Sequence, residues 1–267
     1  MDIAHLIPAV IEAGACVMAH RAAGVQAEEK NDLSPVTIAD REAEAILLAA
    51  LAVEAPGIPV IAEEEAAAGR LPDVDGRFFL VDPLDGTKEY VKGGTDFTVN
   101  VALIDHGMPV CGIVYAPAQN TLWWGDVPRR LAMRAVVENG HIAQKRPIVV
   151  RPCGGRPRAV ASRSHAHPAT EAFLTACGSE DRVSVGSSLK FVLVAEGAAD
   201  LYPRPSPTME WDTAAGHAIL LAAGGRVFDL DGKPLTYGKP NFFNPGFVAT
   251  GPYHPPVMRE FLPETQS

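Results

Sequence analysis

The chain has 267 residues, of which 47% are hydrophobic and 21% charged, and its formal net charge is −9. This composition excludes a disordered chain, and at this length one hydrophobic core tends to divide into two. Proteins that bind nucleic acid through its phosphates need a basic surface, so the negative charge argues against a nucleic-acid partner. If the ligand is an anion, bound cations are the expected means of holding it.

The cysteines are Cys16, Cys111, Cys153 and Cys177, and no two of them have C-x-x-C spacing. This predicts free thiols in a reducing compartment rather than disulfides or a zinc site. The first residues lack the basic region of a secretory signal, and uncharged apolar runs such as 45–53 are shorter than a membrane span of about 18 residues. We expect no transmembrane segment and a cytoplasmic protein, either free or peripheral at the inner membrane face.

In the first half of the chain, apolar spacing predicts an amphipathic helix over 3–24 and a second helix over 39–54. The polar stretch between them, 28–33, is typical of a loop. Asn139 and Gly140 are typical of a tight hairpin turn. Apolar or alternating runs predict strands at 59–62, 77–81, 97–105, 108–115 and 121–125.

From about residue 158 onwards, predicted strands and helices alternate. The strands are 158–162, 182–185, 200–202 and 226–229, and the helices are 168–177, 188–196 and 212–223. The change of pattern predicts an N-terminal α+β half, residues 1–150, and a C-terminal α/β half, residues 151–267. The break is expected between residues 143 and 155.

The most informative sequence is D-P-L-D-G-T, which follows an apolar strand. Pro83 stiffens the turn, so Asp82 and Asp85 can point past the strand end into one volume. Gly86 lets the backbone approach a ligand, and the amides of Gly86 and Thr87 could donate to a phosphate at a helix start. Judged by itself, this segment suits a turn with solvated aspartates equally well.

Further acidic residues follow predicted element junctions at Asp40, at Glu63, Glu64 and Glu65, and at Asp212. Asp40 and Asp212 also suit the start of a helix, where aspartate is a favoured cap. Acidic oxygen ligands without a convincing His or Cys cluster favour Mg²⁺ or Mn²⁺ over zinc. Carboxylates gathered in one site would repel each other without cations. Together, these residues predict a divalent-cation site that could bind a phosphate.

Four segments, in order, resemble the motifs of the inositol monophosphatase superfamily of metal-dependent, lithium-sensitive phosphatases. They are S-P-V-T-I-A-D at 34–40, A-E-E at 62–64, D-P-L-D-G-T at 82–87 and W-D-T-A-A-G at 211–216. Segments at 82–90, 97–105, 162–165, 186–191, 202–204 and 244–247 resemble its bacterial CysQ branch of 3'(2'),5'-bisphosphate nucleotidases. The resemblance implies a layered αβαβα sugar-phosphatase-like fold of the α+β class. It also implies hydrolysis of adenosine 3',5'-bisphosphate to AMP and phosphate, linked to sulfur assimilation.

The resemblance also implies roles for individual residues. Two or three Mg²⁺ ions, or Mn²⁺ instead, would be held by Glu63, Asp82, Asp85, Asp212 and the carbonyl of Leu84. Asp40, Thr87 and Glu63 would orient and deprotonate the attacking water, with Glu64 behind them. The substrate-binding set would be Leu84, Asp85, Gly86, Thr87, Ser162, Arg163, Ser187, Lys190, Arg204 and Asp212.

Two other functions are open at this point: an inositol or sugar monophosphatase, and a non-catalytic, metal-dependent nucleotide-binding protein. Asp40 and Thr87 argue against the latter, because binding alone needs no water-activating pair. A bisphosphate needs additional cations outside the metal cluster, for which Arg163, Lys190 and Arg204 are candidates. The alternative is that these three are solvated surface charges. The sequence leaves open whether the protein is a monomer or a homodimer.

Overall fold

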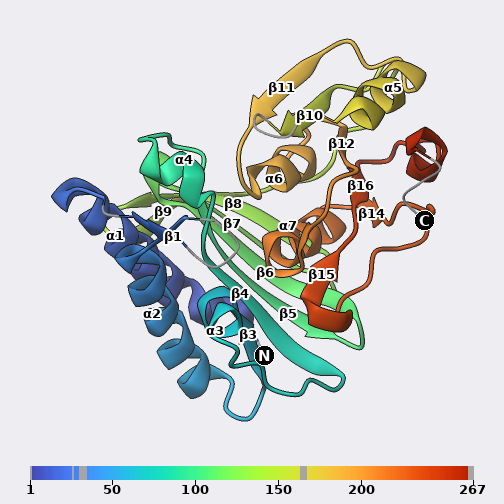
Figure 1. The fold of residues 1–267 in the computed structure, drawn as a ribbon. Coiled ribbons are helices and arrows are strands. Elements are labelled where there is room, and N and C mark those ends of the chain that lie inside the picture. Colours follow the sequence, from blue (N-terminus) through green and yellow to red (C-terminus); the bar gives the residue numbers. More distant parts are fainter. Residues whose placement is uncertain (1, 26, 30–34, 163–166, 264–267) are drawn as a thin grey trace.

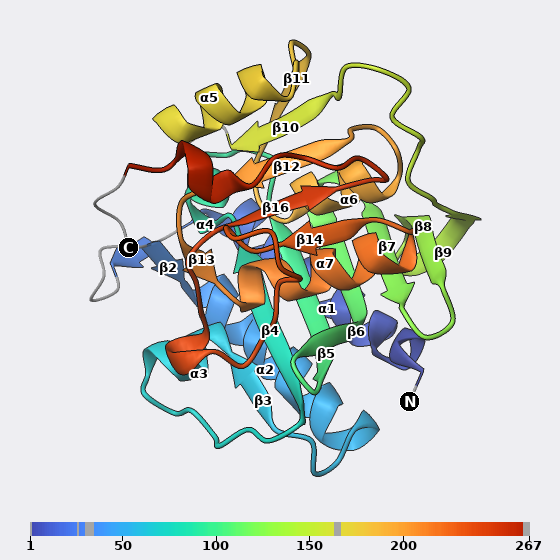
Figure 2. The ribbon, with the colours of Figure 1, turned by 90° about the vertical axis from the view of Figure 1, so that its right-hand side faces the viewer.

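The computed structural model describes residues 2–25, 27–29, 35–162 and 167–263. Its elements form five layers: a helix pair, a seven-stranded sheet, a second helix pair, a five-stranded sheet and an outer helix (Figures 1 and 2). The αβαβα layering that the resemblance implied is therefore confirmed.

The first layer consists of α1 (Ile7–Ala23), preceded by the 3₁₀ turn η1 (Ile3–Leu6), and α2 (Ile38–Glu54). Both helices agree with the sequence prediction to within about a turn. α1 ends at Gly24, whose φ of 100° is a backbone conformation that residues with a side chain rarely adopt. The buried residues that face the sheet recur at helical spacing: Ile7, Val10, Ile11, Val17, Ala43, Leu47 and Leu51.

The segment Ile3–Ala23 is long and apolar enough, by length and composition alone, to cross a membrane. Glu12 and Arg21 interrupt it, so it is not one of the uncharged apolar runs on which the expectation of no transmembrane segment rested. In the fold, its apolar residues are buried in the same cluster as those of α2 and of the sheet beneath. This packing is that of a core helix.

The seven-stranded sheet follows chain order. Its strands are β3 (Val60–Ala62), β4 (Arg77–Asp85), β5 (Thr98–Asp105), β6 (Met108–Ala116), β7 (Thr121–Asp126), β8 (Leu131–Glu138) and β9 (His141–Pro147). β3 and β4 are parallel and the other neighbours are antiparallel. The predicted turn joins β8 to β9, with φ of 50° at Asn139 and 76° at Gly140.

One prediction in this half needs correction. Glu28 and Glu29 belong to a short strand, β1 (Ala27–Glu29), which pairs with β2 (Pro35–Thr37), so the predicted loop is wrong there. Pairing with a neighbouring segment has overridden the polar composition. Residues 30–33 of that prediction lie outside the described residues. The structure adds a short helix after β3, α3 (Glu63–Ala67), and places α4 (Thr87–Val91) at the helix start expected at Gly86 and Thr87.

The second sheet has the order β11-β10-β12-β16-β14. Its strands are β10 (Ala159–Ser162), β11 (Arg182–Val185), β12 (Leu201–Arg204), β14 (Arg226–Phe228) and β16 (Phe247–Thr250). β10 runs parallel to both its neighbours, whereas β16 runs antiparallel to both of its own. β16, which the sequence did not predict as a strand, lies inside the sheet between β12 and β14.

The helices of this half lie on both faces of the second sheet. α6 (Leu189–Ala195) and α7 (Trp211–Ala222) lie between the two sheets, and α5 (Pro168–Ala176) covers the outer face (Figures 1 and 2). The remaining elements are a small ladder, β13 (Thr208–Met209) with β15 (Phe243–Asn244), and the 3₁₀ turns η2 (Pro117–Gln119), η3 (Pro240–Phe242) and η4 (Met258–Phe261).

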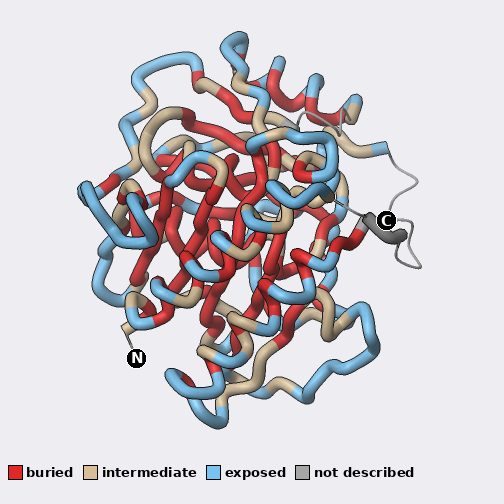
Figure 3. Tube along the Cα trace, turned by 90° about the vertical axis from the view of Figure 1, so that its left-hand side faces the viewer, coloured by how far each residue is buried: buried red, intermediate tan, exposed pale blue. Residues whose placement is uncertain are grey.

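Buried residues follow the central strands and the inner helix faces, while the connecting loops are exposed (Figure 3). One apolar cluster lies between the first sheet and α1 and α2, and another fills the space between the two sheets. A smaller third cluster packs under α5. Within the middle cluster, the rings of Phe191, Tyr202 and Phe247 contact one another at centroid distances of 5.1–5.3 Å.

Glycines let α7 lie directly on the first sheet. A Cβ atom at Gly112 would come within 2.4 Å of the Ala215 carbonyl oxygen, and one at Gly125 within 2.7 Å of the Ile219 Cα. On the side of α7 that faces α6, a Cβ atom at Gly216 would come within 2.6 Å of Phe191. These contacts fix how deep α7 lies between the sheets.

We predict that Gly112→Ala destabilises the protein, because the added methyl group meets backbone atoms of α7 that cannot rotate away. The free energy of unfolding should fall by about 1–3 kcal/mol in urea denaturation. Gly154→Ala is the matched control, since a Cβ atom there has no neighbour within 4 Å. Equal stability of the two variants would contradict the close packing of α7.

Candidate active site

The sequence D-P-L-D-G-T ends β4, and a β-bulge there decides where its aspartates point. In a regular strand, residues three apart lie on opposite faces. Asp82 pairs with Asn100 and Asp85 with Thr98, so β4 has one residue more than β5 between these pairs. The extra residue brings Asp82 and Asp85 to the same face of the sheet. The two aspartates are therefore brought together by a bulge, where the sequence had suggested a turn.

Negative charges gather around this bulge. Burial raises the pKa of the Asp82 carboxyl well above its ordinary value. Neighbouring carboxylates raise it further, those of Glu63, Asp85 and Asp212. Burial and the charge of Asp212 also raise the pKa of Asp85, to about 7. The four carboxylates that were expected to bind metal therefore lie close enough to influence one another's ionisation.

This donor set fits hard divalent cations. Carboxylate oxygens and a backbone carbonyl, that of Leu84, are the ligands that Mg²⁺ and similar ions prefer. The four carboxylates and the carbonyl therefore supply oxygen donors of the type that divalent cations bind.

Asp40 and Thr87 are joined in the structure. The hydroxyl of Thr87 lies 3.3 Å from Oδ1 of Asp40 and 3.0 Å from the carbonyl oxygen of Leu84, so it can donate to either. The other oxygen of Asp40 accepts hydrogen bonds of 2.7 Å from both the amide and the hydroxyl of Thr37. The N-cap of α2 is therefore Thr37, three residues before the cap position that one interpretation of the sequence gave to Asp40. Asp40 still takes part in the capping and also contacts Thr87.

Gly86 connects the bulge to α4. Its φ of 95° lies in the left-handed region, and a Cβ atom there would come within 2.8 Å of the Asp96 carbonyl oxygen. Both constraints require glycine. Gly86 is the N-cap of α4, so the amides of Gly86 and Thr87 lie at a helix start, where backbone donors lack partners within the helix.

Glu63 begins α3, directly after β3 ends. The next two amides, of Glu64 and Glu65, donate to the carboxylate of Glu44 at 2.8 and 3.0 Å. Glu44 is only 3% exposed, and burial raises its pKa to about 7. Glu44 is not among the residues that the sequence singled out. Its position one helical turn after Asp40, on the buried face of α2, was the available signal.

Asp212 comes from the other half of the chain, in the first turn of α7. It was expected at the N-cap, but that position belongs to Glu210, so the predicted cap is wrong by two residues. The Asp212 carboxylate still accepts hydrogen bonds from the amide of Met209, at 3.0 Å, and from the hydroxyl of Thr208. Glu210 is fully buried, and its carboxylate accepts bonds from backbone amides of the loop after Tyr237.

Lys190 and Arg204, two of the cationic side chains that were candidates for binding a bisphosphate, lie beside Asp85. Lys190 is 3% exposed, donates to the Ser187 carbonyl at 2.6 Å and lies over the ring of Tyr202. The charges of Lys190 and Arg204 both lower the pKa of Asp85. Among the described residues, Nε of Arg204 is buried and has no hydrogen-bond partner. The alternative of a solvated surface charge is therefore wrong for Lys190.

Ser187 has a φ of 48°, and its buried hydroxyl has no partner in the described part of the chain. Ser162 ends β10, and its side chain is not described. Arg163 lies outside the described residues. The contacts of the site thus join Asp82 and Asp85 of the first half to three residues of the second half: Lys190, Arg204 and Asp212.

Ser188 is a connection that the sequence analysis did not place in the site. Its amide donates to Asp85 at 2.6 Å, and its hydroxyl donates to Oδ1 of Asn100 at 2.8 Å. The hydroxyl of Thr98 lies 2.8 Å from the same serine oxygen. Its place in the sequence G-S-S-L-K was the only signal. Ser188 joins the start of α6 to the bulge that carries the aspartates.

A family model described as the inositol monophosphatase family matches residues 2–254. This chain belongs to the inositol monophosphatase family. Its members are generally metal-dependent, in agreement with the oxygen donors gathered at the bulge.

Several individual proteins are similar to this chain, and two of them are named CysQ. The chain is 46% identical to the 3'(2'),5'-bisphosphate nucleotidase CysQ of Shigella flexneri over 226 residues, which cover 82% of this chain and 86% of that protein. It is similar in structure to CysQ from Bacteroides thetaiotaomicron, with a TM-score of 0.78 and 35% identity over 95% of this chain and 98% of that one. An IMPase from Thermotoga maritima gives a TM-score of 0.72 and 25% identity, covering 94% and 92% of the two chains.

We predict that Asp85→Asn changes how the stability of this family member depends on pH when metal is removed. The folded pKa of Asp85, about 7, exceeds its unfolded value of 3.8, so the folded state binds more protons between these values. The contribution of Asp85 to stability is therefore present at low pH and is lost as the pH rises towards 7. Asn cannot ionise, so the variant should gain stability relative to the wild type across this range.

The measurement is the Tm of both proteins in a chelator at about pH 5 and about pH 8. Asp73→Asn is the control, because Asp73 is exposed. The Tm difference between Asp85→Asn and wild type should be more positive at the higher pH, whereas Asp73→Asn should show no such change. The same difference at both values would contradict the burial of a repelled carboxylate.

Proposed function

We propose that this chain is a Mg²⁺-dependent phosphomonoesterase that hydrolyses adenosine 3',5'-bisphosphate, and related 3'(2'),5'-bisphosphate nucleotides, to AMP and phosphate. The observation that carries the proposal is the 46% identity, over 82% of the chain, to a protein named for this activity. The repelling carboxylates and the Asp40–Thr87 contact support it, since they provide what a metal-assisted hydrolysis needs.

In this proposal, the first half of the chain, residues 1–150, provides most of the metal ligands. Glu63, Asp82, Asp85 and the Leu84 carbonyl would be ligands, and Asp212 would complete the set from residues 151–267. When bound, two or three Mg²⁺ ions, or Mn²⁺ in their place, would neutralise phosphate oxygens, lower the pKa of a water molecule and stabilise the leaving alkoxide. The protein's own part is to hold these oxygens in place while they repel one another.

Thr87 and Asp40 would position and deprotonate the attacking water. The Thr87 oxygen accepts a hydrogen bond from the water while the hydroxyl donates its proton towards Oδ1 of Asp40. Because Thr37 already occupies the other Asp40 oxygen with two hydrogen bonds, only Oδ1 faces Thr87. Glu63, which would also be a metal ligand, would help to orient and deprotonate this water. Glu64 would lie next to Glu63 without binding the metal itself.

Binding of the substrate would use backbone and cationic groups. The amides of Gly86 and Thr87 would donate to the scissile phosphate. Lys190 and Arg204, together with Arg163 and the hydroxyls of Ser162 and Ser187, would bind the second phosphate and the nucleoside. Among the residues that the structure describes, the buried Nε of Arg204 and the buried hydroxyl of Ser187 have no hydrogen-bond partner, which supports this assignment because buried polar atoms are ordinarily paired. The proposed setting is the cytoplasm, where the protein would act in sulfur assimilation.

We predict that Thr87→Ala lowers kcat far more than it changes the Mg²⁺ concentration needed for half-maximal activity. Loss of a general acid–base group typically reduces the rate by about 10²–10⁴-fold. Thr87→Ser keeps the hydroxyl and should retain most of the activity. The measurement is kcat as a function of Mg²⁺ with adenosine 3',5'-bisphosphate. A variant that regains full kcat at high Mg²⁺ would assign Thr87 a structural role instead.

We also predict that wild-type protein prefers adenosine 3',5'-bisphosphate to inositol 1-phosphate. Lys190→Ala should reduce kcat/KM for the bisphosphate by roughly 10- to 100-fold, because a charge-assisted contact is lost. Some loss with the monophosphate is expected too, since Lys190 stabilises the charge of Asp85. The decisive quantity is therefore the ratio of the two kcat/KM values.

Lys233→Ala is the control for this experiment, because Lys233 is exposed and should leave the ratio unchanged. A wild-type preference for inositol 1-phosphate would replace the proposal by the monophosphatase alternative. If Lys190→Ala leaves the ratio of the two kcat/KM values unchanged, Lys190 does not bind the second phosphate. Absence of phosphate release from either substrate would favour the nucleotide-binding protein.

A further inference from the structure

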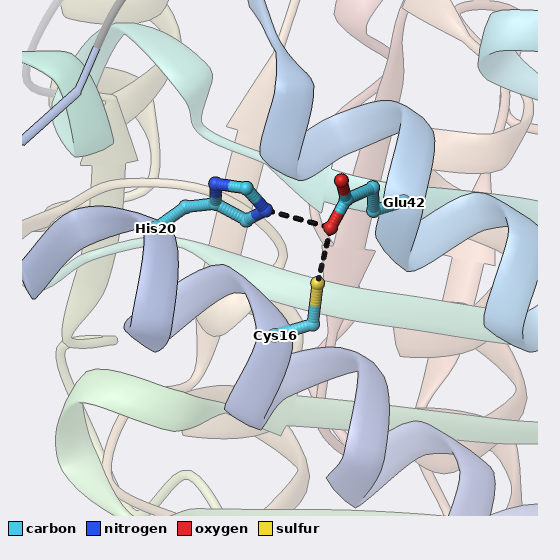
Figure 4. A group of neighbouring side chains, drawn as sticks. All are labelled: Cys16, His20 and Glu42. Atoms are coloured by element: carbon cyan, nitrogen blue, oxygen red, sulfur yellow. Dashed lines mark hydrogen bonds and ion pairs between the residues drawn. The ribbon is translucent and has the colours of Figure 1, made fainter. Parts of the chain in front are cut away.

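Away from the acidic bulge, three side chains of different chemistry meet between α1 and α2 (Figure 4). Cys16 and His20 are one turn apart on α1, and Glu42 faces them from α2. Nε2 of His20 lies 2.7 Å from Oε2 of Glu42, and the Cys16 sulfur lies 3.7 Å from the same oxygen. Within the described residues, this is the one group of three such ligand atoms that all lie within 4.8 Å of one another.

The spacing is close to that of a tetrahedral metal site. Ligands at about 2.3 Å for sulfur and about 2.0–2.2 Å for nitrogen and oxygen lie roughly 3.3–3.6 Å from one another around a tetrahedral ion. The sulfur–oxygen distance of 3.7 Å already agrees with this geometry, and the nitrogen–oxygen distance of 2.7 Å must open slightly. Shifts of this size, on the order of 1 Å, are within reach of side-chain rotation because Glu42 is exposed.

The donor types differ from those of the bulge. Thiolate sulfur and imidazole nitrogen bind zinc-like ions, whereas Mg²⁺ prefers oxygen. We propose that Cys16, His20 and Glu42 form a second cation site, which takes Zn²⁺ or a similar transition-metal ion and leaves its fourth position to water. Three protein ligands with one open position are an established zinc arrangement.

A small cavity and the start of α2 lie next to the cluster. Burial, followed by the charge of Glu42, raises the pKa of the Cys16 thiol, which donates a hydrogen bond to Glu42. Because a metal ion binds the thiolate, occupation of the site would displace the thiol proton to solvent. His20 also borders a small cavity of about 70 Å³, which Thr37 and Tyr90 help to line. Thr37 is the residue that holds Asp40, so this site lies beside the helix start that positions the proposed catalytic pair.

Bound metal would therefore tie α1 to the first turns of α2. An ion that binds only the folded protein stabilises it in proportion to the logarithm of its concentration above Kd. Zn²⁺ should thus raise the Tm of the wild type when Mg²⁺ is already saturating. This effect does not depend on any catalytic activity.

The experiment uses Co²⁺ as a spectroscopic probe for the proposed zinc site, in saturating Mg²⁺. Wild-type protein should bind one Co²⁺ with the near-ultraviolet absorption of a thiolate–cobalt bond, and one equivalent of Zn²⁺ should remove this absorption. The oxygen ligands of the bulge contain no sulfur, so Co²⁺ bound there cannot produce that absorption. Competition by Zn²⁺ then gives the Kd.

Cys16→Ser should abolish the thiolate absorption, and His20→Gln should weaken Zn²⁺ binding by roughly 10-fold or more. Cys153→Ser is the matched control, because Cys153 is a free, half-buried cysteine outside the cluster. It should bind as the wild type does. The proposal is overturned if wild type shows no thiolate absorption, if Cys153→Ser removes it, or if Cys16→Ser keeps wild-type Zn²⁺ affinity and the Zn²⁺-dependent rise in Tm.

Discussion

Repulsion among the buried Asp82 carboxylate and the half-buried carboxylates around the end of β4 is the constraint on which the rest of the structure depends. The bulge turns Asp82 and Asp85 to one face, and their pKa values rise because water is excluded and further negative charges lie nearby. Backbone amides of Leu84 and Ser188 hold the two side chains in place. The fold keeps this group together at a cost that bound cations would relieve, which couples metal binding to stability.

The second half of the chain completes the group, and its placement depends on backbone packing. α7 carries Asp212 and reaches its depth over the sheet only because Gly112 and Gly125 leave room. The buried carboxylate of Glu210 joins the start of α7 to the loop after Tyr237. Substitutions far from the bulge can therefore alter the site by shifting α7, since tight packing transmits small displacements.

The two candidate cation sites lie near one short stretch of α2, and their different ligand types favour different metal ions. Asp40 contacts Thr87 beside the proposed all-oxygen site, while Glu42, two residues later, belongs to a group with sulfur and nitrogen. Side chains two positions apart on a helix point in different directions, so a single helix can contribute to both without mixing their ligands. Their distinct chemistry is what allows each to be tested in the presence of the other.

The sequence by itself determined the helices and most strands, because apolar periodicity and turn residues such as Asn139 and Gly140 act over a few neighbours. It also singled out the acidic residues of the site, since their types and spacing are local. Only the tertiary structure decided the bulge that aligns Asp82 with Asp85, the place of β16 inside a sheet, and the burial of Glu44, Ser188 and Lys190. Strand pairing and burial depend on segments far apart in the chain, which periodicity within one segment cannot encode.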